Sequence, residues 1–169
     1  MTNPVVGIIM GSESDLDIMQ EAAKTLDEFG VAHEVRIVSA HRTPDVMAEY
    51  AATAHERGLK VIIAGAGGSA HLPGMTASET NLPVIAIPVK RAHYGHEAFW
   101  SNIKMPVGIP LATMPENGAK NGALLAVRIL ALNDKTLAQK YADYVKIQHD
   151  EVIAKDQQAQ TDSWESLLH

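Results

Sequence analysis

Short apolar runs alternate with helical repeats along the first half of the chain, and this alternation limits the fold more than any other feature. The runs at residues 5–10, 35–38 and 61–64 are each too short for a helix, which indicates buried strands. Apolar residues at helical spacing follow at 15–29 and 44–57. Because right-handed crossovers place successive helices on a parallel sheet, the pattern predicts an α/β fold.

The rest of the chain extends this pattern and then becomes helical. After a glycine-rich loop and a short helix, we expect strands at 84–87 and 109–113 and helices at 119–132 and 134 to about 155. These elements predict a three-layer αβα sandwich with a parallel, flavodoxin-like (Rossmann-like) sheet and C-terminal helices. Residues 1–155 are expected to form a single domain, and the Gln-rich tail at 156–169 is expected to be poorly ordered.

The charge and composition favour a small-molecule partner. With 14 Lys and Arg against 20 Asp and Glu, the net charge of -6 offers no general attraction to nucleic acid or to an anionic membrane. The chain has no cysteine, which excludes disulfides and thiolate metal sites. Because it has no apolar run of about 18 residues and no signal peptide after Met1, we expect a cytoplasmic protein.

Three turns that each follow a predicted strand carry most of the unusual residues. They span 11–15 (GSESD), 39–44 (SAHRTP) and 64–74 (AGAGGSAHLPG). In a parallel sheet, ligands bind outside the carboxyl ends of the strands, where the chain enters the following helix. The three turns are therefore expected to meet at one edge of the sheet.

The first and third turns each have a structural interpretation beside a functional one. Ser12, Ser14 and Asp15 are typical helix caps, yet the free N–H groups of a first helical turn also suit a phosphate. The glycines within 65–68 either turn the chain or admit a ligand. They match neither the P-loop nor the full GxGxxG pattern.

The histidine and the arginine of the second turn point more firmly to function. Arg42 has little packing reason to follow a buried strand, whereas its guanidinium suits a phosphate or a carboxylate. His41 precedes it, and His71 in the third turn either begins a helix or takes part in the site. The other six histidines are interpreted as surface or packing residues, and no pair has convincing metal-ligand spacing.

The three turn motifs, in this order and at these separations, strongly resemble the PurE family of purine biosynthesis. The resemblance continues through MPVGIP at 105–110 and AKNGALLAVRIL at 119–130, and it covers residues 5–150. Bacterial class I members of the family are N5-carboxyaminoimidazole ribonucleotide mutases. The resemblance therefore implies an isomerase that acts on a small-molecule nucleotide, uses no metal or organic cofactor, and assembles as a homo-oligomer, expected to be an octamer.

The resemblance also implies roles for the residues of the three turns. The nucleotide phosphate would lie among Ser12, Ser14 and Arg42, while Asp15 would hydrogen-bond the ribose hydroxyls. The third turn would close over the aminoimidazole and its carboxylate. The expected catalytic residue is His41, and the expected substrate-binding residues are Gly11, Ser12, Ser14, Asp15, Ser39, Ala40, Arg42, Gly67, Gly68, Ser69, Ala70, His71 and Leu72.

The family reaction moves a carboxyl group from the exocyclic N5 of the substrate to ring carbon C4. It is described as decarboxylation to aminoimidazole ribonucleotide, retention of the CO2 and recapture by C4. An imidazole such as that of His41 suits the proton transfers, because its ordinary pKa of about 6.5 lets it give and take a proton near neutral pH. Backbone N–H groups of the glycine loop would hold the carboxylate.

Two departures from the family pattern leave other activities open. Ser69 stands where the family usually has Ala, and the segment 90–104, expected to be a lid or a subunit contact, has Glu97 and Ala98 in place of Asp and Ser. The alternatives are a paralogue with another substrate, a class II carboxylase that uses aminoimidazole ribonucleotide and CO2, and a non-enzymatic nucleotide-binding protein. Class II members tend to carry Lys at the position of Arg42, which favours the mutase. A receiver-type module is disfavoured, because no acidic residue follows the third strand.

The helix expected at 134–155 carries an apolar stripe of its own. Its members are Leu137, Tyr141, Tyr144, Val145 and Val152. The sheet already has enough helices to cover both faces, so the stripe is expected to dock on a neighbouring subunit. Packing on its own domain is the alternative.

Overall fold

The computed structural model describes residues 3–93, 95–162 and 164–167, and the chain forms two compact units. The first unit, Met1–Leu130, contains the whole sheet. The second unit, Ala131–His169, contains one long helix. Among the helices of the described residues, none is both long and apolar enough to cross a membrane.

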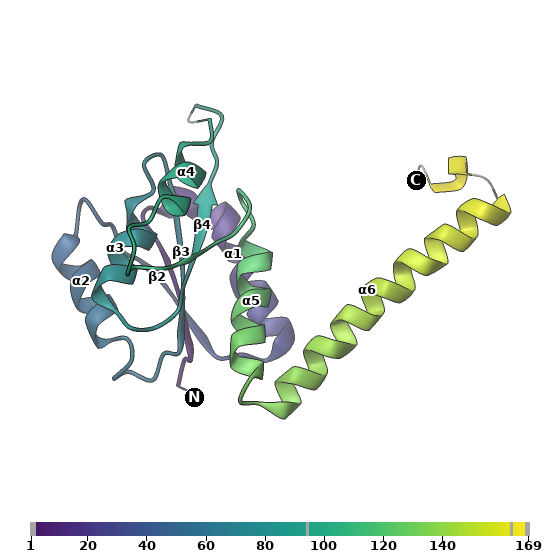
Figure 1. Ribbon diagram of the computed structural model, residues 1–169, viewed down its shortest axis with the longest axis horizontal. Helices are drawn as coiled ribbons and strands as arrows, with labels where there is room; N and C mark the ends of the chain where they lie inside the picture. Colours follow the sequence, from purple (N-terminus) through teal and green to yellow (C-terminus); the bar gives the residue numbers. More distant parts are fainter. Residues whose placement is uncertain (1–2, 94, 163, 168–169) are drawn as a thin grey trace. The chain divides into compact units, whose positions relative to one another are not determined.

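A parallel sheet of five strands forms the centre of the first unit (Figure 1). The strands lie in the order β2-β1-β3-β4-β5, and every pairing is parallel. This confirms the predicted α/β fold, and the order is that of flavodoxin-like sheets. The bounds are β1 (Val6–Met10), β2 (His33–Ile37), β3 (Val61–Gly67), β4 (Val84–Val89) and β5 (Ala112–Thr113).

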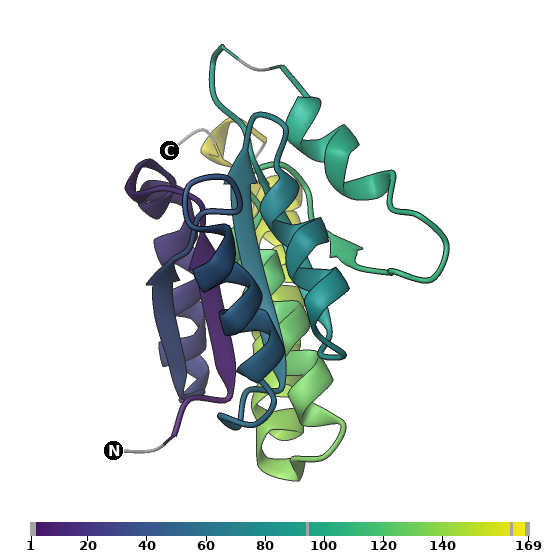
Figure 2. The same ribbon diagram turned by 90° about the vertical axis from the view of Figure 1, so that its left-hand side faces the viewer.

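Helices cover both faces of this sheet, which gives the expected three layers. Figure 1 shows α2 and α3 on one face and α1 and α5 on the other. Figure 2 shows that the strands run in one direction and that the turns after them gather at the upper end of the sheet. The bounds are η1 (Glu13–Asp15), α1 (Leu16–Phe29), α2 (Pro44–Thr53), α3 (His71–Glu79), α4 (Glu97–Ile103), α5 (Ala119–Ala131), α6 (Lys135–Asp162) and η2 (Trp164–Leu167).

The central strands are buried from end to end because helices press on both of their faces. Every residue of β1 and β4 is buried, and each fully buried Ile or Val contributes about 1.5–3 kcal/mol. Gly65 of β3 lets α1 approach closely, since a Cβ there would collide with Sδ of Met19. Gly122 of α5 likewise lies against Ile87 of β4, where a Cβ would come within 2.6 Å of Cδ1. These glycines therefore let α1 and α5 pack closely against β3 and β4.

Several elements differ in extent from the sequence-based expectation. Val35 and Ile37 of β2, the edge strand beside β1, are 42% and 55% exposed. The helix predicted to reach Arg57 ends at Thr53 and continues as turns to Gly58, whose φ is +94°. β3 runs on to Gly67, while β5 shrinks to two residues. No helix was expected where α4 forms.

The second unit contains α6 and the short η2. Asp134 caps the N-terminus of α6, since its Oδ1 accepts from the backbone N–H groups of Thr136 at 2.9 Å and Leu137 at 3.0 Å. The helix continues to Asp162, so residues 156–162 of the predicted tail are helical. Val145 and Val152 of the predicted stripe are exposed. Residues 163, 168 and 169 of that tail lie outside the described residues.

Candidate active site

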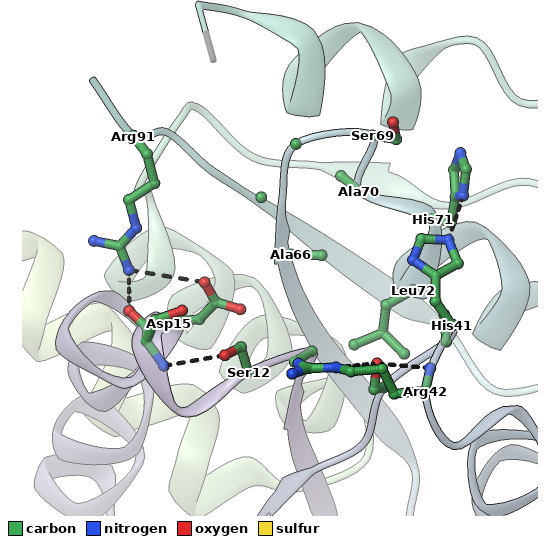
Figure 3. A pocket seen from close by; sticks show the side chains of 16 residues that line it. Ser12, Asp15, His41, Arg42, Ala66, Ser69, Ala70, His71, Leu72 and Arg91 are labelled. Atoms are coloured by element: carbon green, nitrogen blue, oxygen red, sulfur yellow. Dashed lines mark hydrogen bonds and ion pairs between the residues drawn. The ribbon is translucent and has the colours of Figure 1, made fainter. Parts of the chain in front are cut away.

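The turns after β1, β2 and β3 surround one pocket of about 520 Å³ within the first unit. Every expected site residue lines it. In Figure 3, Ser12 and Asp15 lie at one end, His41 and His71 lie at the other, and the glycine loop runs between them. Two residues outside the predicted set complete the lining: Ala66 and Arg91.

The turns meet because the three strands end almost level with one another. Met10 at the end of β1 is in register with Ile37 of β2 and with Gly65 of β3. The backbone pairing continues just beyond, where Val38 N–H donates to Met10 O at 2.8 Å and Gly11 N–H donates to Gly65 O at 3.3 Å. The residues that follow are therefore delivered to the same edge, as expected for parallel strands.

The first turn combines a helix cap with a buried carboxylate. The backbone of Ser12 is extended, and its Oγ accepts from Ser14 N–H at 3.4 Å, so the capping interpretation holds for Ser12. Asp15 is only 6% exposed and makes no side-chain capping bond to α1. Burial raises the pKa of its carboxyl group, and the neighbouring guanidinium of Arg91 opposes that rise. Asp15 is thus available as a buried acceptor at this end of the pocket.

The second turn holds Arg42 at the border with the first. Arg42 Nη2 donates to the carbonyl of Gly11 at 2.7 Å, and Arg42 Nε and N–H donate to Ser39 Oγ at 3.4 Å and 3.2 Å. Thr43 is the N-cap residue of α2, as predicted, but it makes no side-chain capping bond. Its hydroxyl instead pairs with the backbone of Ser39. These contacts orient a guanidinium toward the Ser12 end of the pocket.

The third turn is tight and partly strained. Gly68 has a φ of +61°, and Ala70 has a φ of +43°, which is uncommon for a residue with a Cβ. Ala70 N–H donates to Gly67 O at 3.1 Å, closing the loop just before α3 begins at His71. The positive end of the α3 dipole and the exposed backbone of the loop therefore face the pocket, an arrangement that favours an anion.

Two imidazoles meet at the other end of the pocket. His41 Nε2 lies 2.7 Å from His71 Nδ1, and the rings are nearly perpendicular, with centroids 4.9 Å apart. At that distance one ring nitrogen donates a hydrogen bond and the other accepts it, with the roles set by the tautomers. His71 is also the first residue of α3, as the structural interpretation expected, and whether it takes part in binding stays a prediction.

Arg91 is the functional candidate that the sequence reasoning missed. It lies just after β4, and its guanidinium makes a two-pronged contact with Asp17, with both N–O distances at 2.7 Å. Nη2 also donates to the carbonyl of Ser14 and lies 3.7 Å from Asp15 Oδ1. A cation directly after a fourth parallel strand is the signal that could have found it, because that strand ends at the same edge of the sheet.

The divergent segment around α4 is fastened beside the pocket. Glu116 accepts from His96 Nδ1 at 2.8 Å and pairs with Lys90 Nζ at 3.1 Å. Burial alone would raise the pKa of Glu116, but the bonds from His96 and Lys90 hold it below its ordinary value. Ala98 is buried in the core, which suits a small apolar residue where the family has Ser.

Ser69 connects the pocket with a second hollow of about 560 Å³ against α4. That hollow is lined by Glu97, Trp100, Ser101 and Lys104 in addition to Ser69. The two departures from the family pattern therefore lie next to each other. Within the described ranges, no group of three or more His, Cys, Asp or Glu residues is placed to hold a metal ion.

Comparisons with known proteins identify the family of this chain. The family described as AIR carboxylase matches residues 5–151. The N5-carboxyaminoimidazole ribonucleotide mutase of Thermotoga maritima is 50% identical over 98% of each chain, and that of Pyrococcus horikoshii is 51% identical over 98% of this chain and 94% of its own. The crystal structure of Treponema denticola PurE superposes with a TM-score of 0.80 at 34% identity, covering 92% of this chain and 98% of that one. The resemblance drawn from the three turns is confirmed: the chain belongs to the AIR carboxylase family.

Proposed function

We propose that this protein is an N5-carboxyaminoimidazole ribonucleotide mutase, an isomerase that moves a carboxyl group from N5 to C4 of the substrate in purine (IMP) biosynthesis. Relatives from two organisms carry that name and align with this chain over almost their whole lengths. The observation that carries the proposal is the contact between His41 and His71 in a pocket whose far end presents anion-binding groups. The cytoplasm is the compartment expected for this activity.

The nucleotide would bind at the end formed by the first and second turns. Arg42 is held there by Gly11 O and Ser39 Oγ, so its planar fork is set before a phosphate arrives. Ser12 and Ser14 add hydroxyl and backbone donors beside it. Asp15, buried and acceptor-rich, suits the hydroxyl groups of a ribose. This assignment places the base toward the glycine loop.

The carboxylate and the released CO2 would lie under the third turn. Gly67, Gly68 and Ala70 line the pocket with little side-chain bulk, so backbone N–H groups can approach a carboxylate. The α3 N-terminus adds a positive dipole end there. Holding CO2 within such a loop keeps it near C4 until recapture.

His41 would carry the proton through both halves of the reaction. As imidazolium it gives a proton to N5 while the carbamate C–N bond breaks and CO2 leaves. Carbon C4 then attacks CO2, and the neutral imidazole removes the proton from C4, which restores the imidazolium. One proton is delivered and one is recovered, so the cycle needs no co-reactant.

His71 would support this cycle from 2.7 Å away. Because one ring nitrogen donates a hydrogen bond and the other accepts it, the contact restricts rotation of the His41 ring. His71 thereby orients the imidazole that faces the substrate.

The runner-up function is direct carboxylation of aminoimidazole ribonucleotide with CO2, the class II activity. This reaction would use the same pocket. Arg42, the residue after His41, favours the mutase, because class II members tend to carry Lys at that position. The experiment offers the purified protein the N5-carbamate and, separately, aminoimidazole ribonucleotide with bicarbonate. Faster product formation from the carbamate supports the mutase, and the reverse order supports the carboxylase.

We also propose that the protein assembles as a homo-octamer through α6. Exposed Val145 and Val152 on this helix, with Tyr141 and Tyr144 alongside, would pack on a neighbouring subunit. Most helical stability in proteins comes from packing of an apolar face, so burial of this stripe would stabilise α6.

A further inference from the structure

Arg91 joins three parts of the pocket wall that the chain makes separately. It extends from the end of β4, its fork binds Asp17 on α1, and its Nη2 donates to the carbonyl of Ser14 in the first turn. The side chain of Arg91 is 31% exposed and that of Asp17 is 58% exposed, so solvent screens their ion pair and the contact serves mainly to orient the guanidinium. With the fork engaged by Asp17, Arg91 is suited to hold protein groups in place rather than to bind a substrate anion.

Asp15 is the group that most depends on this arrangement. Its side chain is 9% exposed, and a buried carboxylate is costly unless a positive charge or donors compensate it. Among the described residues, the charged groups that act on Asp15 are Arg91, which favours its ionised form, and Asp17, which opposes it. Figure 3 shows the Arg91 guanidinium beside the Asp15 carboxylate, and the dashed line that joins these two groups marks their ion pair, in which Nη2 lies 3.7 Å from Oδ1.

We propose that Arg91 is a positioning residue of the nucleotide-binding end: it fixes the Ser14–Asp15 turn against the end of β4 and supplies the counter-charge of Asp15, with Asp17 as its anchor. The inference rests on the proposed function in one respect, namely that Asp15 receives the ribose hydroxyls. A charged, fixed carboxylate is a better acceptor for two hydroxyls than a neutral, mobile one. Arg91 therefore acts on nucleotide affinity through Asp15 and has no part in proton transfer at His41.

The test compares three variants with a matched control. Arg91→Met keeps the aliphatic stem and removes the charge, Arg91→Lys keeps the charge and removes the fork, and Asp17→Asn removes the anchor. Lys90→Met is the control, because Lys90 is the neighbouring cation, pairs with Glu116 and does not line the pocket. The measurements are KM and kcat for the carbamate, the Kd of aminoimidazole ribonucleotide by calorimetry, and the Asp15 carboxyl titration by NMR.

Arg91→Met is expected to raise KM and Kd roughly tenfold or more, while kcat stays close to that of the unmodified protein. The KM and Kd of Arg91→Lys should lie between those of Arg91→Met and those of the unmodified protein. Asp17→Asn should weaken binding in the same direction, and the double variant with Arg91→Met should be no worse than Arg91→Met alone. Removing the counter-charge raises the pKa of Asp15 further, so the acidic limb of kcat/KM should move to higher pH.

Two results would overturn the inference. A folded Arg91→Met protein with unchanged Kd and an unchanged Asp15 titration would show that Arg91 does not position the nucleotide-binding end. A fall in kcat with unchanged KM and Kd would show that Arg91 acts in the chemical step and not in binding. If Arg91→Met does not fold, Arg91→Lys and Asp17→Asn decide the question by the same measurements. If the unmodified protein does not bind the nucleotide, the proposed function is rejected. The Asp15 titration is made without substrate, so it still tests the role of Arg91 in that case.

Discussion

Arg42 Nη2 lies 2.7 Å from the carbonyl oxygen of Gly11, which ties the second turn of the pocket to the first. The two residues follow neighbouring strands, β2 and β1, so the contact spans the edge of the sheet at which the turns meet. It holds a guanidinium in one orientation before any ligand binds. Preorganisation of this kind lowers the cost of binding an anion.

Arg42→Lys tests the phosphate assignment. Lysine keeps the charge but loses the planar fork, so the affinity for aminoimidazole ribonucleotide should fall about tenfold. The free energy of unfolding should change by less than about 0.5 kcal/mol, because Arg42 is exposed and fills no core volume. Calorimetry measures the first quantity and urea unfolding the second; equal affinities for the two proteins would contradict the assignment.

Glu116→Gln tests how the divergent segment is fastened. The pKa of Glu116 is lowered in the folded protein, so its ionised form stabilises the fold. That stabilisation is complete above the unfolded value of 4.5 and is lost as the pH falls through the lower folded value. The variant should therefore unfold at lower urea than the unmodified protein near pH 7, and the two should converge in acid.

A matched control for that comparison is Glu28→Gln, at an exposed position of α1. It should leave the urea midpoint unchanged across the same pH range. A difference between Glu116→Gln and the unmodified protein that persists unchanged in acid would show that the ion pairs with His96 and Lys90 are not its source.

Removal of α6 tests the assembly. A chain that ends before Asp134 lacks the apolar stripe, so it should sediment as a smaller species, while a chain that ends at Asp162 keeps α6 and should sediment like the full-length protein. The first unit contains the whole sheet and its core, so the shorter chain is expected to remain folded. A folded truncation with an unchanged number of subunits would reject α6 as the contact.

The parts of the fold that follow from local pattern were predictable from the sequence. β1, β3 and β4 are buried on both faces, so each is a short continuous apolar run. Position in the sheet is not local, and the exposed Val35 and Ile37 of β2 look the same in sequence as buried strand residues. α4 was also not predicted, because its seven residues are too few to establish a helical period.

The residues of the site likewise differ in whether local sequence could predict them. Residues that share one turn, such as His41 and Arg42, stand out as a motif, and three such motifs were enough to assemble most of the pocket. Arg91 belongs to no motif, and only its position after β4 brings it to Asp17 and Asp15. The burial of Asp15 and the 2.7 Å contact between His41 and His71 likewise arise from packing between separate elements. The roles of the residues in the pocket stay predictions.

The most direct test of the central claim is the turnover of the carbamate by His41→Asn, measured beside its Kd for aminoimidazole ribonucleotide. Asparagine keeps a polar side chain in the turn but neither gives nor takes a proton near neutral pH, so turnover should fall by about 10²- to 10⁴-fold while the Kd and the fold are retained. His55→Asn, at an exposed position away from the pocket, should turn over normally. Turnover by His41→Asn close to that of the unmodified protein would contradict the account.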